Sequence, residues 1–333
     1  MKRAQVFITH SPHALSHYYG PRALAALQAV SDVRTHDSEA ELTVPDLVEH
    51  ARDCNIIVSD RVHAGSAALL TQLPNLLAFC RCAVDIRNVD VAAATAQGIL
   101  VTQASAGFKT SVTEWIIGVM VDLSRGISDA TLSYHDGQVP IARMGRELRG
   151  STLGLIGFGQ IARTLAPIAR ALGMRLLIND PFAEIDPSDG ETVELSHLLA
   201  ESDFVVCLAV ATPDTENLMN AAAFAAMKPT AYFVNASRGN LVDEAALLQA
   251  LDTGKIAACA LDVGRAPDQM PSRALARHPL VIATPHIGGL TPQAIEHQSM
   301  ETVQQITALL QGRMPAGAVN PDQALRLKKW LAS

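Results

Sequence analysis

The chain contains little cysteine and no long apolar run. Its five cysteines form no disulfide framework, and Cys80 and Cys82 lack a second Cys or His pair at the spacing of a metal site. These absences predict buried free thiols, no bound metal and a reducing, cytoplasmic location. No apolar stretch reaches the length of a transmembrane helix, and Met1-Lys2-Arg3 leads straight into a strand at 4–8. We therefore expect no membrane partner and no secretory leader.

Basic residues are also too few for a partner rich in phosphate. Lys and Arg number 26 against 33 Asp and Glu, which gives a net charge of −7. Nucleic acid is therefore excluded as an expected partner, because phosphate binding requires a basic face. Apolar residues make up 49% of the 333 residues, enough for a sizeable core, and the length exceeds that of one ordinary core. Two domains are expected.

Strand-like and helix-like segments alternate along the sequence. In the first hundred residues the expected strands are 6–9, 55–59, 76–80 and 99–102, with a helix at 21–30. The later strands are expected at 153–156, 175–179, 204–210, 231–235, 258–262 and 281–284, with helices at 111–125 and 293–310. This alternation predicts parallel sheets with helices on both faces. Residues 126–150 are polar and predicted to be irregular, and we interpret them as a candidate arm or subunit contact.

Two glycines follow an apolar strand and precede a helical stretch near the middle of the chain. Gly157 suits a tight turn, Gly159 lets the backbone approach a pyrophosphate, and the small Ala162 lets the helix pack on the strand. The helix N-terminus offers unpaired N–H groups and a positive dipole end to phosphates. Asp180, after the second strand, can accept hydrogen bonds from an adenosine ribose and would repel a 2′-phosphate. The order predicts a dinucleotide site for NAD rather than NADP.

Polar residues follow three of the later strands. Arg238 comes shortly after one strand, Asp262 ends the next and leads into a loop carrying Asp268, and His286 follows the last. Ligands of doubly wound sheets bind outside the carboxyl ends of the strands. A cation, an acid and a histidine at the ends of successive strands therefore indicate a reaction site beside the nicotinamide.

Taken together, these motifs resemble the D-isomer-specific 2-hydroxyacid dehydrogenase family. The resemblance covers nearly the whole chain and, besides the glycine loop, lies in segments 81–90, 107–114, 211–220, 235–247 and 284–289. It implies an α/β fold of two doubly wound parallel-sheet domains. A Rossmann NAD-binding domain at 104–286 would be inserted in a flavodoxin-like substrate (catalytic) domain at 1–103 plus 287–333. It also implies an enzyme that interconverts a small 2-oxo acid and its D-2-hydroxy acid with NAD. A homodimer is expected from the resemblance and from the apolar helix at 111–125.

The resemblance further implies roles for individual residues. His286 would act as general acid in reduction and base in oxidation, Arg238 would clamp the substrate carboxylate, and Asp268 would partner the histidine. The implied substrate residues are Val84, Asp85, Arg238 and His286. The implied cofactor residues are Gly157, Gly159, Gln160, Ile161, Asp180, Ala209, Thr212, Ala236, Arg238, Asp262, His286 and Gly288.

The chain departs from the family pattern beside the expected histidine partner. The family's usual Glu aligns with Pro267, so Asp268 takes its place only if one residue is inserted. An Asp side chain is one methylene shorter than Glu, and the extra backbone residue would restore its reach. The alternative is that Asp268 is a solvated loop acid and that His286 works without a partner.

A second departure lies in the expected substrate loop. The family usually has Gly-Val-Gly, whereas this chain has Ala83-Val84-Asp85. Asp85 places a negative charge beside an expected anion site, which is unfavourable unless Arg87, Arg81 or a cationic substrate group balances it. The alternatives are an Asp85 that points away and offers only its N–H, or an unusual substrate with an amino or extra polar group.

Residues after the first strand form another candidate substrate contact. His10 and His13 lie in the loop Thr9-His10-Ser11-Pro12-His13, and Ser59-Asp60-Arg61 follows a neighbouring strand. Histidines in such a loop can read a polar substrate group or a second carboxylate. Helix capping and solvent exposure are the alternative explanation.

Two other functions remain compatible with these residues. Corepressor relatives of the family sense NAD(H) and keep the catalytic residues, although this chain lacks the extended tails or basic stretches that such a role favours. Oxidation of formate or phosphite is a third option, but formate-type sites place Gln beside the histidine, and Asp268 counts against it. The short segment after the last helix leads us to expect no regulatory ligand-binding domain.

Overall fold

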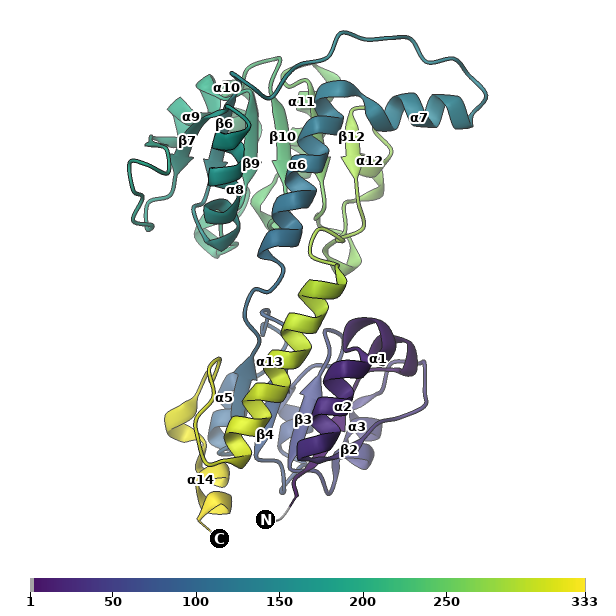
Figure 1. The fold of residues 1–333 in the computed structure, drawn as a ribbon, viewed down its shortest axis with the longest axis vertical. Coiled ribbons are helices and arrows are strands. Elements are labelled where there is room, and N and C mark those ends of the chain that lie inside the picture. Colours follow the sequence, from purple (N-terminus) through teal and green to yellow (C-terminus); the bar gives the residue numbers. More distant parts are fainter. Residues whose placement is uncertain (1–2, 333) are drawn as a thin grey trace. The chain divides into compact units, whose positions relative to one another are not determined.

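The chain folds into two compact units, one inserted in the other (Figure 1). The computed structural model describes residues 3–332, apart from the side chain of Asp268. Unit 1 comprises Met1–Gly107 and Thr291–Ser333, and unit 2 comprises Phe108–Leu290. Each end of the insertion lies a few residues beyond the boundary expected from the sequence, at 107 rather than 103 and at 290 rather than 286.

Unit 1 is built on a five-stranded parallel sheet with the order β2-β1-β3-β4-β5. Its strands are β1 Gln5–Ile8, β2 Asp32–Arg34, β3 Ile56–Ser59, β4 Ala78–Arg81 and β5 Leu100–Gln103. Its helices are α1 Pro12–Tyr18, α2 Pro21–Val30, α3 Val44–Ala51, α4 Ala67–Leu70, α5 Val91–Ala96, α13 Pro292–Leu310 and α14 Leu325–Leu331, with a 3₁₀ turn at Pro321–Gln323. Side-chain caps begin several of these helices, as at Ser11, Thr43 and Thr291.

Both faces of this sheet are covered. Leu27 of α2 and Ile306 of α13 pack on one face with Val6 and Val58, in a cluster that also includes α14. The other face belongs to a second cluster, which joins α3, α4 and α5 to strand residues Phe7, Ile57, Phe79 and Val101. Burial on both sides explains why the central strands are continuous apolar runs.

Unit 2 is built on a seven-stranded parallel sheet with the order β12-β11-β10-β9-β6-β7-β8. Its strands are β6 Thr152–Ile156, β7 Arg175–Asn179, β8 Glu191–Thr192, β9 Phe204–Cys207, β10 Tyr232–Asn235, β11 Ala258–Leu261 and β12 Val281–Ala283. Its helices are α6 Lys109–Arg125, α7 Ile127–His135, α8 Gln160–Ala171, α9 Leu195–Glu201, α10 Ala221–Ala226, α11 Glu244–Asp252 and α12 Arg273–Ala276. Three 3₁₀ turns lie at Pro213–Thr215, Gly239–Leu241 and Pro267–Gln269.

Helices also cover both faces of the second sheet. Ile116 of α6 and Leu165 of α8 share a core cluster with Leu155 and Val206 of the strands. Helices α9 to α12 contribute to the opposite cluster, in which Phe224 meets Phe233 edge to face with ring centroids 5.4 Å apart. The predicted fold class, two doubly wound parallel-sheet domains, is confirmed.

The segment between α6 and β6 corrects one expectation. Residues 126–150 were expected to be irregular, but Gly126 adopts φ +63°, ends α6 and is followed by helix α7. No residue of α7 is buried, so this helix packs no apolar face against the rest of unit 2. Figure 1 shows α7 and the stretch after it running out from the rest of the unit. Residues 136–150 are irregular, as expected, so α7 and this stretch together form an exposed arm.

Smaller differences concern the sheet edges. The short edge strands β2 and β8 were not expected, because their exposed polar residues lack an apolar pattern. The strand expected at 204–210 ends at Cys207, and residues 208–210 begin the loop that follows it. Within residues 3–332, no helix is both long enough and apolar enough to cross a membrane. In the same part of the chain, no group of three or more side chains is arranged to hold a metal ion.

Candidate functional site

The glycine turn lies at the switch point of the seven-stranded sheet. Strand β6 is flanked by β7 on one side and β9 on the other, so the strand order switches sides of β6 beside Gly157. Gly157 has φ +91°, and a Cβ there would lie 2.7 Å from the backbone nitrogen of Ala209 in the loop after β9. Only glycine combines this conformation with so close an approach.

Gly159 provides the open part of the turn. It is the N-cap of α8, no side chain caps the helix there, and nothing lies within 4 Å of the position that a Cβ would take. Gln160 and Ile161 form the first turn of the helix, whose amide groups have no partner within the helix. The bare backbone and the positive helix end fit a pyrophosphate.

Asp180 closes the turn from the end of β7. Its Oδ2 accepts a hydrogen bond from the Phe158 amide at 2.7 Å, and its Oδ1 accepts from the amides of Phe182 and Ala183 at 2.9 and 3.0 Å. Burial alone would raise the pKa of Asp180, but these amide hydrogen bonds outweigh burial and lower it. The carboxylate therefore stays charged beside the glycine turn, as a ribose acceptor requires.

The loops after β9 and β10 are tied together at the same edge. The Ser237 hydroxyl donates to the Ala209 carbonyl at 2.6 Å, so Ala209 and the Ala236-Ser237 segment lie side by side. Thr212 is exposed in the β9 loop, where its amide donates to the Thr215 hydroxyl at 2.8 Å. The structure thus brings Gly157, Ala209 and Ala236 together along one edge of unit 2.

Arg238 is held by its backbone at the end of β10. Asn235 donates its Nδ2 to the Arg238 carbonyl at 3.0 Å and accepts the Ser237 amide at 3.1 Å on Oδ1. The Arg238 side chain is half-buried, and its guanidinium donates to the Ser237 carbonyl at 2.7 Å. Gly239 packs directly on the next loop, because a Cβ there would lie 2.1 Å from the carbonyl carbon of Gly264.

His286 sits in a strained turn that Asp262 builds. The Asp262 carboxylate is 3% exposed and accepts hydrogen bonds from the Thr284 hydroxyl at 2.6 Å and from the Ile287 and Gly288 amides at 2.8 Å each. His286 lies between these anchors with φ +55°, a conformation that costs a non-glycine residue about 1–3 kcal/mol. Asp262 was expected beside the cofactor, and the structure shows that it also fixes the histidine turn.

The far side of this turn rests on α6. A Cβ on Gly288 would lie 2.8 Å from Asp262 and 3.6 Å from Trp115, and one on Gly289 would lie 3.0 Å from Phe108. Because β10, β11 and β12 are neighbours in the sheet, the segments carrying Arg238, Asp262 and His286 leave the sheet at the same edge. The side chain of Asp268 lies outside the described part of the chain, so its pairing with His286 stays a prediction.

The expected substrate loop lies in unit 1. Arg87 donates to both carboxylate oxygens of Asp85, with the closest pair at 2.6 Å, and its amide also donates to Asp85 Oδ1. Of the countercharges considered for Asp85, Arg87 is therefore in direct contact with its carboxylate. Buried Arg81 donates from Nε to the Asp85 carbonyl at 3.1 Å and so holds the loop that begins with Val84.

A buried polar cluster stands at the carboxyl ends of β1 and β3 in unit 1. His63 donates from Nδ1 to Asp60 at 2.8 Å, and its Nε2 accepts the Leu42 amide. His10 is 2% exposed, packs edge-on against Tyr19, and its Nδ1 has no hydrogen-bond partner among residues 3–332. Burial lowers the pKa of His10 to about 4, so this histidine is neutral near neutral pH. His13, in contrast, is exposed on α1, and Ser11 caps that helix.

Sequence reasoning missed two features of the site. The contacts by which Asp262 holds the histidine turn leave no pattern in the sequence, apart from the position of Asp262 upstream of the Thr-Pro-His motif. Arg265 also escaped notice, although its side chain contacts the loops after β9 and β10. An arginine in a polar loop has no sequence pattern of its own, so only the folded arrangement reveals it.

Comparison with known proteins agrees with this geometry. Residues 117–288 match the family model described as the NAD binding domain of the D-isomer specific 2-hydroxyacid dehydrogenases. The D-3-phosphoglycerate dehydrogenase of Synechocystis sp. is 35% identical over 314 residues, which cover 90% of this chain and 55% of that protein. The D-3-phosphoglycerate dehydrogenase of Methanocaldococcus jannaschii is 33% identical over 302 residues, with 89% and 57% covered. The chain thus spans about half the length of these curated relatives.

The solved structures extend the likeness to the fold. The apo structure of D-lactate dehydrogenase from Escherichia coli is similar with a TM-score of 0.80 and 27% sequence identity. The likeness covers 95% of this chain and 99% of that chain. It therefore includes both units as well as the matched domain.

Proposed function

Because the chain belongs to the D-isomer specific 2-hydroxyacid dehydrogenase family, we propose that it transfers a hydride between NAD(H) and a small 2-oxo or 2-hydroxy acid, with the D isomer as the hydroxy acid. The observation that carries the proposal is the His286 turn. A histidine is held at φ +55° by a buried carboxylate, at the same sheet edge as a glycine turn that fits a dinucleotide. Backbone strain of this kind persists only where surrounding contacts hold it, and such residues cluster at active sites.

The side chain of His286 is proposed as the proton carrier. In reduction it donates a proton to the C2 oxygen of the 2-oxo acid, and in oxidation it takes the proton of the C2 hydroxyl. The hydrogen bonds to Asp262 hold the backbone on both sides of His286 in place. Asp268, on the loop after β11, is proposed to hydrogen-bond the imidazole and stabilise its protonated form.

Arg238 is proposed as the clamp for the substrate carboxylate. Its planar guanidinium presents paired donors that match a carboxylate, and beside C2 it also polarises the carbonyl. The support is positional, since β10 lies two strands from β12 and the Arg238 backbone is fixed by Asn235. Binding by two residues from different strands orients the acid for transfer to one face, which gives a single isomer.

Unit 2 is an NAD binding domain, and its residues fit the cofactor. Bound NAD(H) supplies the hydride. Gly157 and Gly159 give the pyrophosphate room, the first turn with Gln160 and Ile161 gives it amide donors, and Asp180 accepts from the adenosine ribose. Ala209, Thr212, Ala236 and Gly288 are proposed to line the rest of the site. The charged Asp180 carboxylate disfavours the 2′-phosphate of NADP.

Unit 1 is proposed as the substrate domain. Its Ala83-Val84-Asp85 segment would contribute backbone N–H groups and the Val84 side chain to the acid. Because Arg87 pairs with Asp85, the loop adds little net negative charge against an anionic substrate. An unusual cationic substrate is therefore not needed to explain Asp85.

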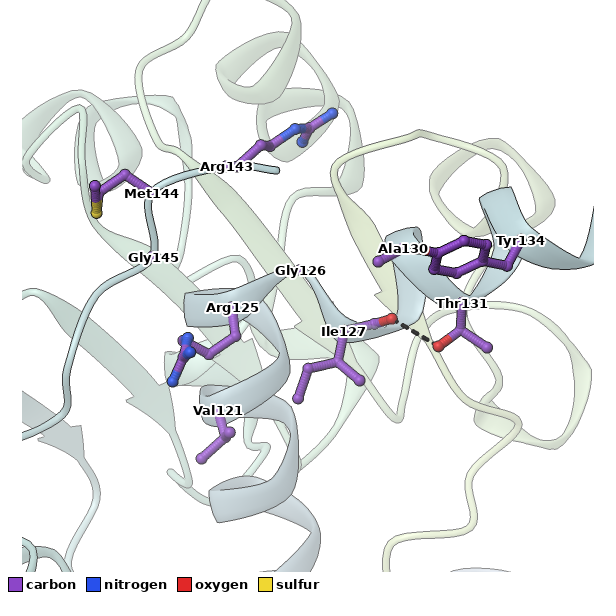
Figure 2. Close-up of a pocket in the computed structure, with 10 residues that line it drawn as sticks. All are labelled: Val121, Arg125, Gly126, Ile127, Ala130, Thr131, Tyr134, Arg143, Met144 and Gly145. Carbon is purple, nitrogen blue, oxygen red and sulfur yellow. Dashed lines mark hydrogen bonds between the residues drawn. The ribbon is translucent and has the colours of Figure 1, made fainter. Parts of the chain in front are cut away.

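The exposed arm supports a homodimer. Ile127, Leu132, Tyr134, Ile141 and Met144 are between 51% and 100% exposed, all within one short segment. A groove of about 620 Å³ lies beside them, between the end of α6, α7 and residues 143–145. Figure 2 shows the residues that line it. One segment thus offers both protruding apolar side chains and a hollow, which suits a self-complementary contact with a second copy.

The cysteines support a reducing compartment, proposed here as the cytoplasm. All five, Cys54, Cys80, Cys82, Cys207 and Cys259, are buried free thiols. Thiols of this kind persist where disulfides do not form.

The function is tested by following NADH and NADPH oxidation with glyoxylate, hydroxypyruvate, pyruvate and dicarboxylic 2-oxo acids. We expect at least one acid to be reduced, with NADH preferred. Silence across the panel by a protein that still binds NADH would overturn the proposal and favour an NAD(H)-sensing protein.

A further inference from the structure

The guanidinium of Arg265 lies where three loops of unit 2 meet. It donates from one terminal nitrogen to Asn217 Oδ1 at 2.6 Å and to the Asn240 carbonyl at 3.0 Å, and from Nε to the Val242 carbonyl at 3.2 Å. Asn217 belongs to the loop after β9, Asn240 and Val242 to the loop after β10, and Arg265 to the loop after β11. One side chain therefore fastens the segments that leave three neighbouring strands.

Other contacts reinforce this junction. Glu216 forms an ion pair with Arg265 at 2.8 Å and also accepts from Asn240 Nδ2 at 3.2 Å. The Arg265 amide donates to Glu244 at 3.0 Å. Asn217 has φ +54°, so the backbone of the loop after β9 is strained at the residue that accepts a hydrogen bond from Arg265. Strained backbone needs such anchors to persist.

The junction lies between two residues of the proposed reaction. Asn240 follows Arg238 by two positions, and Gly239 rests against Gly264, the neighbour of Arg265. On the other side, the Gly264 amide donates to the Gln269 carbonyl at 2.7 Å and closes the loop that carries Asp268. Gln269 has φ +58°, so this loop also carries a strained backbone position.

We propose that Arg265 is a positioning residue that sets the reach of Arg238 toward the substrate carboxylate, an inference that rests on the proposed function. The guanidinium fork fixes two backbone carbonyls in the segment that begins at Arg238. A lysine carries the same charge but has no fork, so it cannot hold Asn217, Asn240 and Val242 together. The hydrogen bonds from Arg265 to the two backbone carbonyls, rather than its surface ion pair with Glu216, should therefore position Arg238.

The test compares Arg265→Met, Arg265→Lys and Glu216→Gln with the wild-type protein. The probe is oxamate, an unreactive analogue of a 2-oxo acid, titrated into the NADH-bound protein by calorimetry. We expect Arg265→Met and Arg265→Lys to weaken oxamate binding about tenfold or more, because clamp geometry is lost. We expect Glu216→Gln to stay within about twofold of wild type, and every variant to bind NADH within about twofold.

Matched controls separate positioning from general stability. Arg175→Met removes another exposed Arg–Glu pair of unit 2, with Glu191 at 2.7 Å, and should leave oxamate binding unchanged. Asn217→Gly keeps the positive φ while deleting one acceptor, and provides a milder variant if Arg265→Met does not fold. With a reducible acid, the loss should appear mainly in KM rather than in kcat.

The outcomes distinguish this inference from the function on which it rests. Unchanged oxamate affinity in Arg265→Met, or full rescue by Arg265→Lys, overturns the positioning role. Wild-type protein that binds oxamate but reduces no acid overturns the proposed reaction, while weakened oxamate binding in the variants still supports the positioning of Arg238.

Discussion

At the scale of residues, backbone strain is concentrated at one edge of unit 2. Within residues 3–332, the non-glycine residues with positive φ are Asn217, Gln269 and His286. They lie in the loops after β9, β11 and β12, each at the carboxyl end of its strand. Each such conformation costs about 1–3 kcal/mol, so the surrounding hydrogen bonds must hold it. These strained positions therefore cluster at the edge where we propose the reaction.

The two glycines of the dinucleotide turn should respond differently to the same substitution. Gly157→Ala places a Cβ at φ +91°, 2.7 Å from Ala209, and should lower the unfolding free energy by about 1–3 kcal/mol or more. Gly159→Ala meets open space at φ −79°, and should change that free energy by less than about 1 kcal/mol. Its methyl group fills the cradle, so NADH affinity should still fall about tenfold or more. Denaturant unfolding and fluorescence titration with NADH measure both effects, and wild-type NADH affinity in Gly159→Ala would contradict the assigned site.

Asp262 should matter for catalysis as well as for folding. In Asp262→Asn, an amide NH₂ replaces one of two acceptor oxygens and faces a donor, which should cost about 1–3 kcal/mol of unfolding free energy. The released turn should also lower kcat by about tenfold or more, because His286 loses its fixed backbone. Asp186→Asn is the matched control, since Asp186 is exposed and its carboxylate accepts hydrogen bonds from nearby Ser188 in a surface turn. A normal kcat in Asp262→Asn would remove the positioning role of Asp262.

At the scale of elements, the apolar periodicity of the sequence predicts most of the helices and strands. Buried strands such as β6 and β10 contrast sharply with their flanking loops, and Gly157 marks the turn between β6 and α8. Edge strands β2 and β8 could not be recognised, because they are short, exposed and mostly polar. Helix α7 could not be recognised because it buries no residue, so its few apolar residues do not follow the pattern of a packed helix. Motif residues Arg238 and His286 were found by their places after strands. Arg265 and the Asp262 contacts depend on loops that meet only in three dimensions.

The polar cluster at the carboxyl edge of the first sheet should make unit 1 sensitive to acid. Burial lowers the pKa of His10 from 6.5 to about 4, so between these values the unfolded chain binds a proton that the folded chain does not. Stability should therefore fall by about 3 kcal/mol as pH drops from 6.5 toward 4. Burial alone would raise the pKa of Asp60, but the hydrogen bond with His63 and the nearby His10 outweigh burial and lower it to about 2. The folded protein therefore loses further stability as the pH falls below 3.8, the ordinary pKa of Asp60.

His10→Gln isolates this effect, because glutamine is polar but does not titrate. Urea unfolding at a series of pH values between 4 and 6.5 should show a flatter dependence in the variant than in wild type. Equal slopes in the two proteins would show that His10 titrates normally and is not buried in its neutral form.

At the scale of the whole molecule, the chain passes twice between its units, near Gly107 and near Leu290. The residues of the proposed proton transfer and carboxylate clamp, together with the dinucleotide turn, belong to the inserted unit, whereas the Val84-Asp85 loop belongs to the surrounding one. The sequence indicated this insertion because the glycine motif begins near the middle of the chain. The substrate itself could not be inferred, since the motif residues indicate the reaction and not the rest of the acid.

The arm should decide the oligomeric state. Leu132→Glu combined with Ile141→Glu places charges on side chains that are 61% and 87% exposed, and should convert a dimer to a monomer. Leu325→Glu is the control, because Leu325 is 64% exposed on α14 of unit 1, away from the arm in sequence. Light scattering after size exclusion measures the mass. A wild-type monomer, or a dimer that survives the double substitution, would refute the proposed interface.

Isotope labelling directly follows the proposed hydride transfer, which should yield a D-2-hydroxy acid. NADH deuterated at both C4 positions is incubated with the 2-oxo acid that the panel identifies, and the product is analysed by chiral separation and mass spectrometry. We expect one deuterium at C2 of the D isomer, and no labelled product with His286→Ala although NADH still binds. An L or racemic product, a product without deuterium at C2, or undiminished turnover by His286→Ala would contradict it.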